Sequence, residues 1–241
     1  MWYVSDKSFL ECFRINECVH FAGFNYGRGT YHPYESFVAR LHKGDALTDI
    51  RAQFETFLCR YRPRHFGEAL GITLGRKYPL WLFPWSRFWR YWRIDTNAAW
   101  FTDPCDIPDI ITHFSSRGIP REMVDKEQNW LFRAYESISK IGYCPESFGY
   151  PSGRVLLAAD GARACIILDG NHRVSTLSAL GYSTVDIRCW PWNIVRQDAL
   201  DDWPGVRNGY FARQDAEKIF LAYFQDRQSY ACGDHLGSIV G

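Results

Sequence analysis

The most constraining feature of this 241-residue chain is a series of turn signals within residues 155–181. Two apolar, strand-like runs flank the Asp160-Gly161 pair, which is typical of a two-residue hairpin turn. A second pair, Asp169-Gly170, turns the chain into a predicted helix over Asn171–Leu180, and Gly181 follows where that helix would end. The pattern therefore predicts a β-hairpin followed at once by a helix whose N-terminus lies at a sheet edge.

The segments around this unit complete an α+β pattern. The hairpin strands are predicted over Val155–Ala159 and Ala164–Leu168, and a third strand over Val185–Trp190. A last helix is predicted from Ala212 to Phe224. Its inward side is expected to comprise Ala216, Ile219, Phe220 and Tyr223.

A further helix is predicted before the hairpin, over residues 125–141. Asp125 is suited to cap it, Gln128 stands three residues later as in a capping box, and Gly142 follows its end. Apolar residues recur at three- and four-residue steps, which predicts the inward side. That side would comprise Val124, Leu131, Tyr135, Ile138 and Ile141.

The N-terminal part of the chain has a different character. Aromatic residues make up 17% of the sequence and are frequent here, and the opening segment has no clear period. Apolar residues within 37–58 recur at helical spacing, which predicts helix there. The pair Asp103-Pro104 then marks a loop or linker. We therefore predict a helical, aromatic-rich region over residues 1–105 and an α+β domain over residues 106–241.

The turn into helix 171–180 is the best candidate for a ligand site. A helix N-terminus presents unpaired N–H groups and the positive end of the helix dipole, and Gly170 lets a ligand approach the backbone. Asn171, His172 and Arg173 add donors suited to phosphate oxygens. Asp169 is explained either as a Mg²⁺ ligand or proton-handling group, or as an ordinary turn aspartate.

These residues carry a resemblance to a known family. The run Ile166-Ile167-Leu168-Asp169-Gly170-Asn171-His172-Arg173, followed by Leu177 and Ala179-Leu180-Gly181, resembles the signature of the ParB/sulfiredoxin superfamily. The segment Val124-Asp125-Lys126-Glu127-Gln128 is similar to the start of the helix before the hairpin in that fold. The resemblance covers residues 117–190 and implies a small mixed sheet with flanking helices that binds a nucleotide.

Three members of the superfamily suggest different functions. Sulfiredoxin has a cysteine where this chain has Asn171, and ParB carries a helix-turn-helix after this domain, so neither activity is expected. The ADP-dependent free serine kinase has an Asp-Gly-His-His-Arg motif and a glutamate in a His-Glu-Gln segment. Asp169 and Glu127 occupy the positions of its two key carboxylates. Asn171 departs from the first histidine, and the long substrate region of that kinase has no counterpart, so serine does not carry over.

The resemblance implies a nucleotide-dependent kinase that acts on a small hydroxylated metabolite or sugar. Glu127 would be the general base, Asp169 would organise Mg²⁺ and the transferring phosphate, and the Gly170–Arg173 turn would bind ATP or ADP, with CTP as a further option. Glu127 is equally explained as a solvated first-turn glutamate. The alternative function is a non-catalytic nucleotide-binding adapter that docks on a membrane or on a glycan-synthesis enzyme.

A second feature is the acid-free segment over residues 76–93. It mixes Trp81, Trp85, Trp89 and Trp92 with Arg76, Lys77, Arg87, Arg90 and Arg93. This mixture suits peripheral contact with an anionic membrane or a lipid-linked glycan, and it equally suits buried tryptophans covered by arginine stems. Together with Trp203-Pro204-Gly205-Val206-Arg207-Asn208-Gly209, the pattern looks like uncharacterised ParB-like proteins linked to bacterial surface polysaccharide synthesis.

Composition limits which partners and which cellular locations are expected. A net charge of +1 lacks the basic field of a general nucleic-acid binder, so no specific nucleic-acid partner is expected. The eight cysteines show neither CxxC pairs nor zinc-finger spacing, which predicts free thiols in a reducing cytoplasm. We expect a cytoplasmic protein, at most peripheral to a membrane. His32, within Tyr31-His32-Pro33-Tyr34, is explained as a structural or a site residue.

Overall fold

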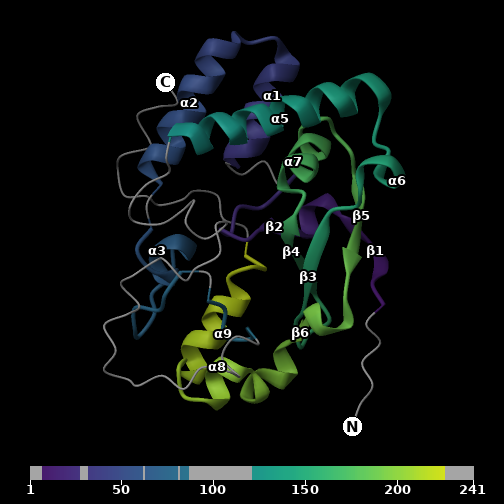
Figure 1. Cartoon of the computed structure of the whole chain (residues 1–241). Helices are drawn as coiled ribbons and strands as arrows, with labels where there is room; N and C mark the ends of the chain where they lie inside the picture. Colours follow the sequence, from purple (N-terminus) through teal and green to yellow (C-terminus); the bar gives the residue numbers. More distant parts are fainter. Residues whose placement is uncertain (1–6, 28–31, 62, 81, 87–120, 226–241) are drawn as a thin grey trace.

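A computed structural model describes residues 7–27, 32–61, 63–80, 82–86 and 121–225 of the chain. Within these residues six strands form one mixed sheet in the order β1-β5-β3-β4-β2, and β6 pairs with β3 (Figure 1). The strands are β1 (Phe9–Arg14), β2 (Cys18–His20), β3 (Ser152–Leu157), β4 (Arg163–Asp169), β5 (Thr184–Cys189) and β6 (Ile194–Arg196). This arrangement confirms a mixed α+β architecture, while the ParB-like topology stays a prediction.

Helices gather at two ends of the sheet, with α1, α2, α5 and α7 at one end and α8 and α9 at the other (Figure 1). The helices are α1 (Pro33–Lys43), α2 (Leu47–Arg60), α3 (Phe66–Leu70), α5 (Arg121–Ile141), α6 (Pro145–Phe148), α7 (Asn171–Ala179), α8 (Pro204–Arg207) and α9 (Arg213–Leu221). The 3₁₀ helices are η1 (Ile15–Glu17), η5 (Pro191–Asn193) and η6 (Gln197–Asp202). The end that holds α5 and α7 is also where the predicted site residues lie.

The C-terminal half folds largely as its turn residues predict. β3 and β4 form an antiparallel hairpin, and Gly161 in its turn has a φ of 88°. α7 starts two residues after Asp169, the last residue of β4, and Gly181 follows α7 with a φ of 82°. The four residues expected on the inward side of the last helix are all buried: Ala216, Ile219, Phe220 and Tyr223.

The start of α5 differs from the prediction. The helix extends to Arg121, so Asp125 lies inside it and is exposed, and the predicted cap is wrong. Gln128 is buried instead of completing a capping box, because its Nε2 donates to the carbonyl of Arg51 on α2 over 3.0 Å. Ile141, expected on the inward side, is 58% exposed at the end of the helix.

The N-terminal region is not purely helical, because it supplies two strands of the sheet. β1 pairs antiparallel with β5, and β2 pairs parallel with β4, with Cys18 opposite Cys165. One hydrophobic core joins Phe24 and Phe57 from this region to Ile166 and Phe220 from the C-terminal half. The predicted boundary near residue 105 lies outside the described residues, and the parts on either side of it share one sheet and one core.

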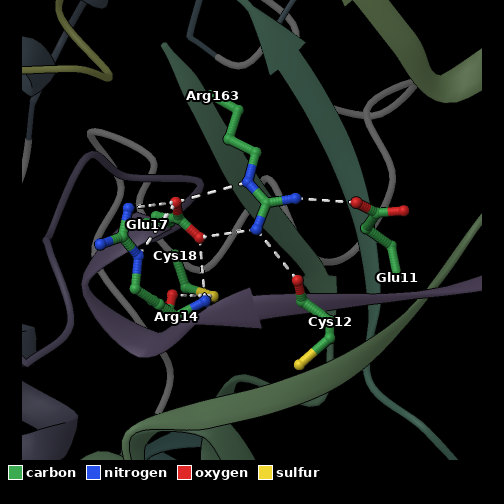
Figure 2. A network of polar contacts seen from close by, with 6 residues as sticks. All are labelled: Glu11, Cys12, Arg14, Glu17, Cys18 and Arg163. Carbon is green, nitrogen blue, oxygen red and sulfur yellow. Dashed lines mark hydrogen bonds and ion pairs between the residues drawn. The ribbon is translucent and has the colours of Figure 1, made fainter.

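The two outer strands of the sheet are consecutive in the chain, with only the three residues of η1 between them. Three residues of 3₁₀ helix advance about 6 Å, so the sheet must curl until its edges approach each other at this end. Figure 2 shows the result: Arg163 of β4 donates to Glu11 of β1 over 2.8 Å and to Glu17 of η1 over 3.1 Å. Although burial acts to raise it, hydrogen bonds from Arg14 and Arg163 hold the pKa of Glu17 below its ordinary value.

The tryptophan-rich segment is described only in part. Trp85 is 7% exposed and packs in the core, as the buried interpretation of this segment requires, while Arg76 and Lys77 are exposed. The other members of the segment, Trp81, Arg87, Trp89, Arg90, Trp92 and Arg93, lie outside the described residues. Among the described helices, none has the length and apolar character needed to cross a membrane.

Candidate functional site

The candidate site is built on the junction between β4 and α7. Gly170 is the N-cap of α7, has a φ of 87° and carries no side chain that could satisfy the first N–H groups. The Val174 amide donates to the Gly170 carbonyl over 3.0 Å, and the amides of Asn171, His172 and Arg173 precede this first bond of the helix. These three amides and the helix dipole suit an anion.

Gly170 is required here by the protein's own packing. A Cβ at this position would lie 2.9 Å from the Pro151 Cβ and 3.0 Å from the Arg173 Nη2. The positive φ and these close contacts both exclude larger residues. The predicted reason, close approach of a ligand, is therefore not needed to explain this glycine.

Arg173 folds back over the turn and binds protein groups. Its Nη1 donates to the carbonyls of Phe148 and Gly149, and its Nη2 donates to Asp169 Oδ2 over 3.2 Å. The Asp169 side chain is 74% exposed, so this ion pair lies at the surface. Contact of either side chain with a nucleotide phosphate would require this pair to rearrange or to accept the ligand alongside.

Glu127 of α5 lies against the start of α7. His172 Nε2 and Glu127 Oε2 are 2.8 Å apart, and the Glu127 residue is only 5% exposed. The alternative of a solvated first-turn glutamate is therefore wrong. In the tautomer that fits this contact, the Nε2–H of His172 donates to the Glu127 carboxylate, and Nδ1 is the ring nitrogen that takes no part in it.

A buried tyrosine and a buried histidine, Tyr34 and His20, lie next to the Glu127–His172 pair. The Tyr34 ring is 5.6 Å from the His172 ring, and burial together with the charge and hydrogen bonding of Glu127 raises the pKa of Tyr34 well above its ordinary value. His20 is fully buried beside Tyr34, and burial lowers the pKa of His20 well below its ordinary value. Both groups therefore stay neutral near Glu127 at physiological pH.

Asn171 is held in place by a buried tyrosine. Tyr26, which is fully buried, donates from its hydroxyl to Asn171 Oδ1 over 2.8 Å. The Asn171 carboxamide nitrogen then remains as a donor at the start of α7. Tyr26 lies 145 residues before Asn171 in the chain, so the sequence pattern around the motif could not reveal this contact.

Trp130 is a residue of the site that the sequence did not single out. Its ring is 5.5 Å from the His172 ring, and the residue is 43% exposed. It lies three residues after Glu127 on α5, so both side chains face the start of α7. An exposed indole beside a helix N-terminus is suited to stack against a flat ring.

A pocket of about 310 Å³ adjoins the same motif. It lies between the end of α5, α6 and Arg173, and its apolar wall includes Ile138, Tyr143 and Phe148. Within the described residues, no group of three histidine, cysteine or acidic side chains is gathered to hold a metal ion. Mg²⁺ would fit here only with Asp169 as a single protein ligand and phosphate oxygens as the others.

The predicted site residues thus separate into two groups. Glu127, Asn171 and His172 converge at the start of α7, while Asp169 and Arg173 pair with each other at the surface. In comparisons with protein-family models, curated proteins and solved structures, this chain has no significant match. The resemblance to the ParB/sulfiredoxin superfamily therefore rests on the motif residues themselves.

Proposed function

We propose that this protein is a nucleotide-dependent phosphotransferase that acts on a small hydroxylated metabolite. The observation that supports this proposal most is the 2.8 Å hydrogen bond between Glu127 and His172 at the N-terminus of α7. It places an oriented imidazole beside amides that suit a phosphate. A buried carboxylate that fixes the tautomer of a histidine is a recurrent way to prepare a general base.

The roles of the two residues follow from their exposure. Glu127 is buried, whereas the His172 side chain is 23% exposed, so His172 is the group that a substrate can reach. In the proposed step, Nδ1 of His172 takes the proton of the substrate hydroxyl. The hydroxyl oxygen forms a bond to the terminal phosphorus, the phosphoanhydride bond breaks, and the shortened nucleotide leaves with the bridging oxygen. Glu127 stabilises the imidazolium that results.

The nucleotide would bind along the start of α7. The amides of Asn171, His172 and Arg173 would receive its phosphates, and Trp130 would stack on its base. Mg²⁺, when bound, would neutralise phosphate oxygens beside Asp169. The apolar pocket next to Arg173 is then available for the body of the substrate.

The test begins with nucleotide binding. Thermal shift and calorimetry against ADP, ATP, CTP and GTP with Mg²⁺ identify the nucleotide, and transfer is then assayed with a panel of hydroxylated metabolites. We expect Glu127→Gln and His172→Gln to lower turnover by about 10²–10⁴-fold while nucleotide affinity changes little. Glu122→Gln, an exposed substitution on the same helix, is the matched control. Unchanged turnover in both site variants would contradict the proposal.

One observation favours the alternative function, a non-catalytic nucleotide-binding adapter. The ion pair between Asp169 and Arg173, together with the two carbonyls bound by Arg173, gives the charged residues of the motif a structural role in holding the α6 loop. Such a protein would bind nucleotide as a ligand without transferring phosphate. Nucleotide binding that persists with no transfer to any hydroxyl acceptor, in wild type and in Glu127→Gln alike, would favour the adapter.

A further inference from the structure

A second and larger pocket is lined by residues of β6 and by Pro204 at the start of α8. These two elements lie at the end of the sheet away from α7 (Figure 1). Its volume is about 560 Å³, within the usual range of about 300–1,000 Å³ for small-molecule sites. The residues that define its chemistry are Trp85, Arg154, Trp192, Asn193, Arg196 and Trp203. They come from segments that are far apart in the sequence, and none belongs to the candidate site at the start of α7.

The floor of this pocket is aromatic and firmly held. Trp85 and Trp203 are 7% and 4% exposed, and their ring centroids are 5.2 Å apart at an angle of 78°. Trp203 also donates from Nε1 to the Arg196 carbonyl over 3.2 Å. Because the two rings meet almost at right angles, they form a corner that suits a puckered ring better than a slot for a flat base.

Trp192 supplies a further aromatic wall. It is half-buried, and its ring lies 6.1 Å from that of Trp190 at an interplanar angle of 28°. Stacking on Trp190 fixes the orientation of the indole, so its plane is available as a flat surface beside the pocket. Indole faces of this kind are suited to the C–H faces of a sugar ring.

Polar side chains also line this pocket. Asn193 is 7% exposed, and its Oδ1 is 3.5 Å from Arg154 Nη2. The Arg154 guanidinium also lies 5.8 Å from the centroid of the Phe83 ring. At the rim, Arg196 forms an ion pair with Asp198 over 2.8 Å. A guanidinium offers several donors in one plane, which suits hydroxyl oxygens and, more strongly, a carboxylate or phosphate.

We propose that this pocket binds a hexose-type sugar that carries an anionic group, either a carboxylate or a phosphate. The sugar ring would pack on Trp192 and on the corner formed by Trp85 and Trp203. Its hydroxyls would bond to Asn193, and its anionic group would face Arg154. The inference does not depend on the phosphotransferase proposal, because the two sites share no residue.

The test uses intrinsic tryptophan fluorescence and calorimetry on the full chain. The probes are glucuronate, glucose 6-phosphate, glucose and inorganic phosphate. Comparison of their affinities distinguishes the contributions of the carboxylate, the phosphate and the sugar ring to binding. We expect saturable binding of at least one anionic sugar, with weaker binding of glucose and none of phosphate alone. Arg154→Gln should lower the affinity for the anionic sugar by about 10- to 100-fold, because a hydrogen bond to a charged group is lost.

Two further variants keep the test specific. Trp192→Ala should lower the affinity for glucose and for anionic sugars alike. Arg213 is exposed and lies outside the pocket, so Arg213→Gln should bind these sugars like wild type. His172→Gln should also bind like wild type, which separates this site from the one at α7. Absence of saturable binding by every sugar, equal binding by Trp192→Ala, or equal affinity for inorganic phosphate would overturn the proposal.

Discussion

At the residue scale, two histidines take the place of the usual helix caps. His32 Nδ1 accepts from the Glu35 amide and His65 Nδ1 from the Glu68 amide, each over 3.3 Å. Caps are ordinarily sought among serine, threonine, aspartate and asparagine, so the sequence left the role of His32 open. Its buried position at the start of α1 identifies it as a structural residue.

The buried state of His32 predicts a loss of stability in acid. Burial lowers the pKa of His32 from 6.5 to about 3, so the unfolded chain binds a proton that the folded chain does not. The contribution of the neutral His32 to the free energy of unfolding is therefore complete above pH 6.5, and it is lost as the pH falls from 6.5 towards 3. Urea unfolding at a series of pH values measures this effect. Between pH 7.5 and pH 4.5, we expect the free energy of unfolding to fall more steeply for wild type than for His32→Asn.

His32→Ala is the matched control for this experiment. Both substitutions remove the titrating group, but only asparagine can cap α1, so His32→Ala should be less stable than His32→Asn by about 0.5–2 kcal/mol at pH 7.5. The decline that remains in both variants would include the contribution of His20, which is also buried. Equal pH dependence of wild type and both variants would contradict the assignment.

At the element scale, the predictable strands are those with turns beside them. β3, β4 and β5 were predicted because Asp-Gly and glycine signals bound them, whereas β1 and β2 were missed. β2 comprises three residues, all buried, and is too short to show any period. The contacts of Tyr26, Tyr34 and Trp130 with the motif depend on how distant elements pack, so the motif predicted the position of the site but not its full composition.

A glycine in β3 makes room for a buried thiol on the neighbouring strand β4. Cys18, Cys165 and Cys189 are fully buried, on β2, β4 and β5. A Cβ on Gly153 would lie 2.3 Å from the Cys165 Sγ and 2.9 Å from the Ile187 Cγ2. Gly153 therefore provides the space that the Cys165 side chain occupies.

Gly153→Ala should destabilise the protein by about 1–3 kcal/mol, because an added methyl group overfills a packed core. Cys165→Ala in the same chain removes the closest atom and should recover part of that loss, whereas Cys59→Ala, at an exposed cysteine, should recover none. Chemical denaturation of the single and double variants measures the coupling. Purely additive effects of Gly153→Ala and Cys165→Ala would contradict this account of the packing.

At the scale of the whole molecule, the N-terminal strands protect both outer strands of the C-terminal part. β1 covers β5 and β2 covers β4, so a chain without them would expose two unpaired strand edges. Residues 106–241 expressed alone should therefore self-associate or fail to fold, as gel filtration and circular dichroism would reveal. A monomeric, cooperatively melting fragment would instead support an independent domain beginning near residue 105.

The position of β1 and β2 also affects the order of events during synthesis. Glu11 and Arg163, which form an ion pair across the curled sheet, are 152 residues apart along the chain. At about 5–20 residues per second, a ribosome needs about 8–30 seconds to reach the partner of a strand that left it first. The earliest strands to emerge must therefore wait without their neighbours, and the sheet closes only after most of the chain has been translated.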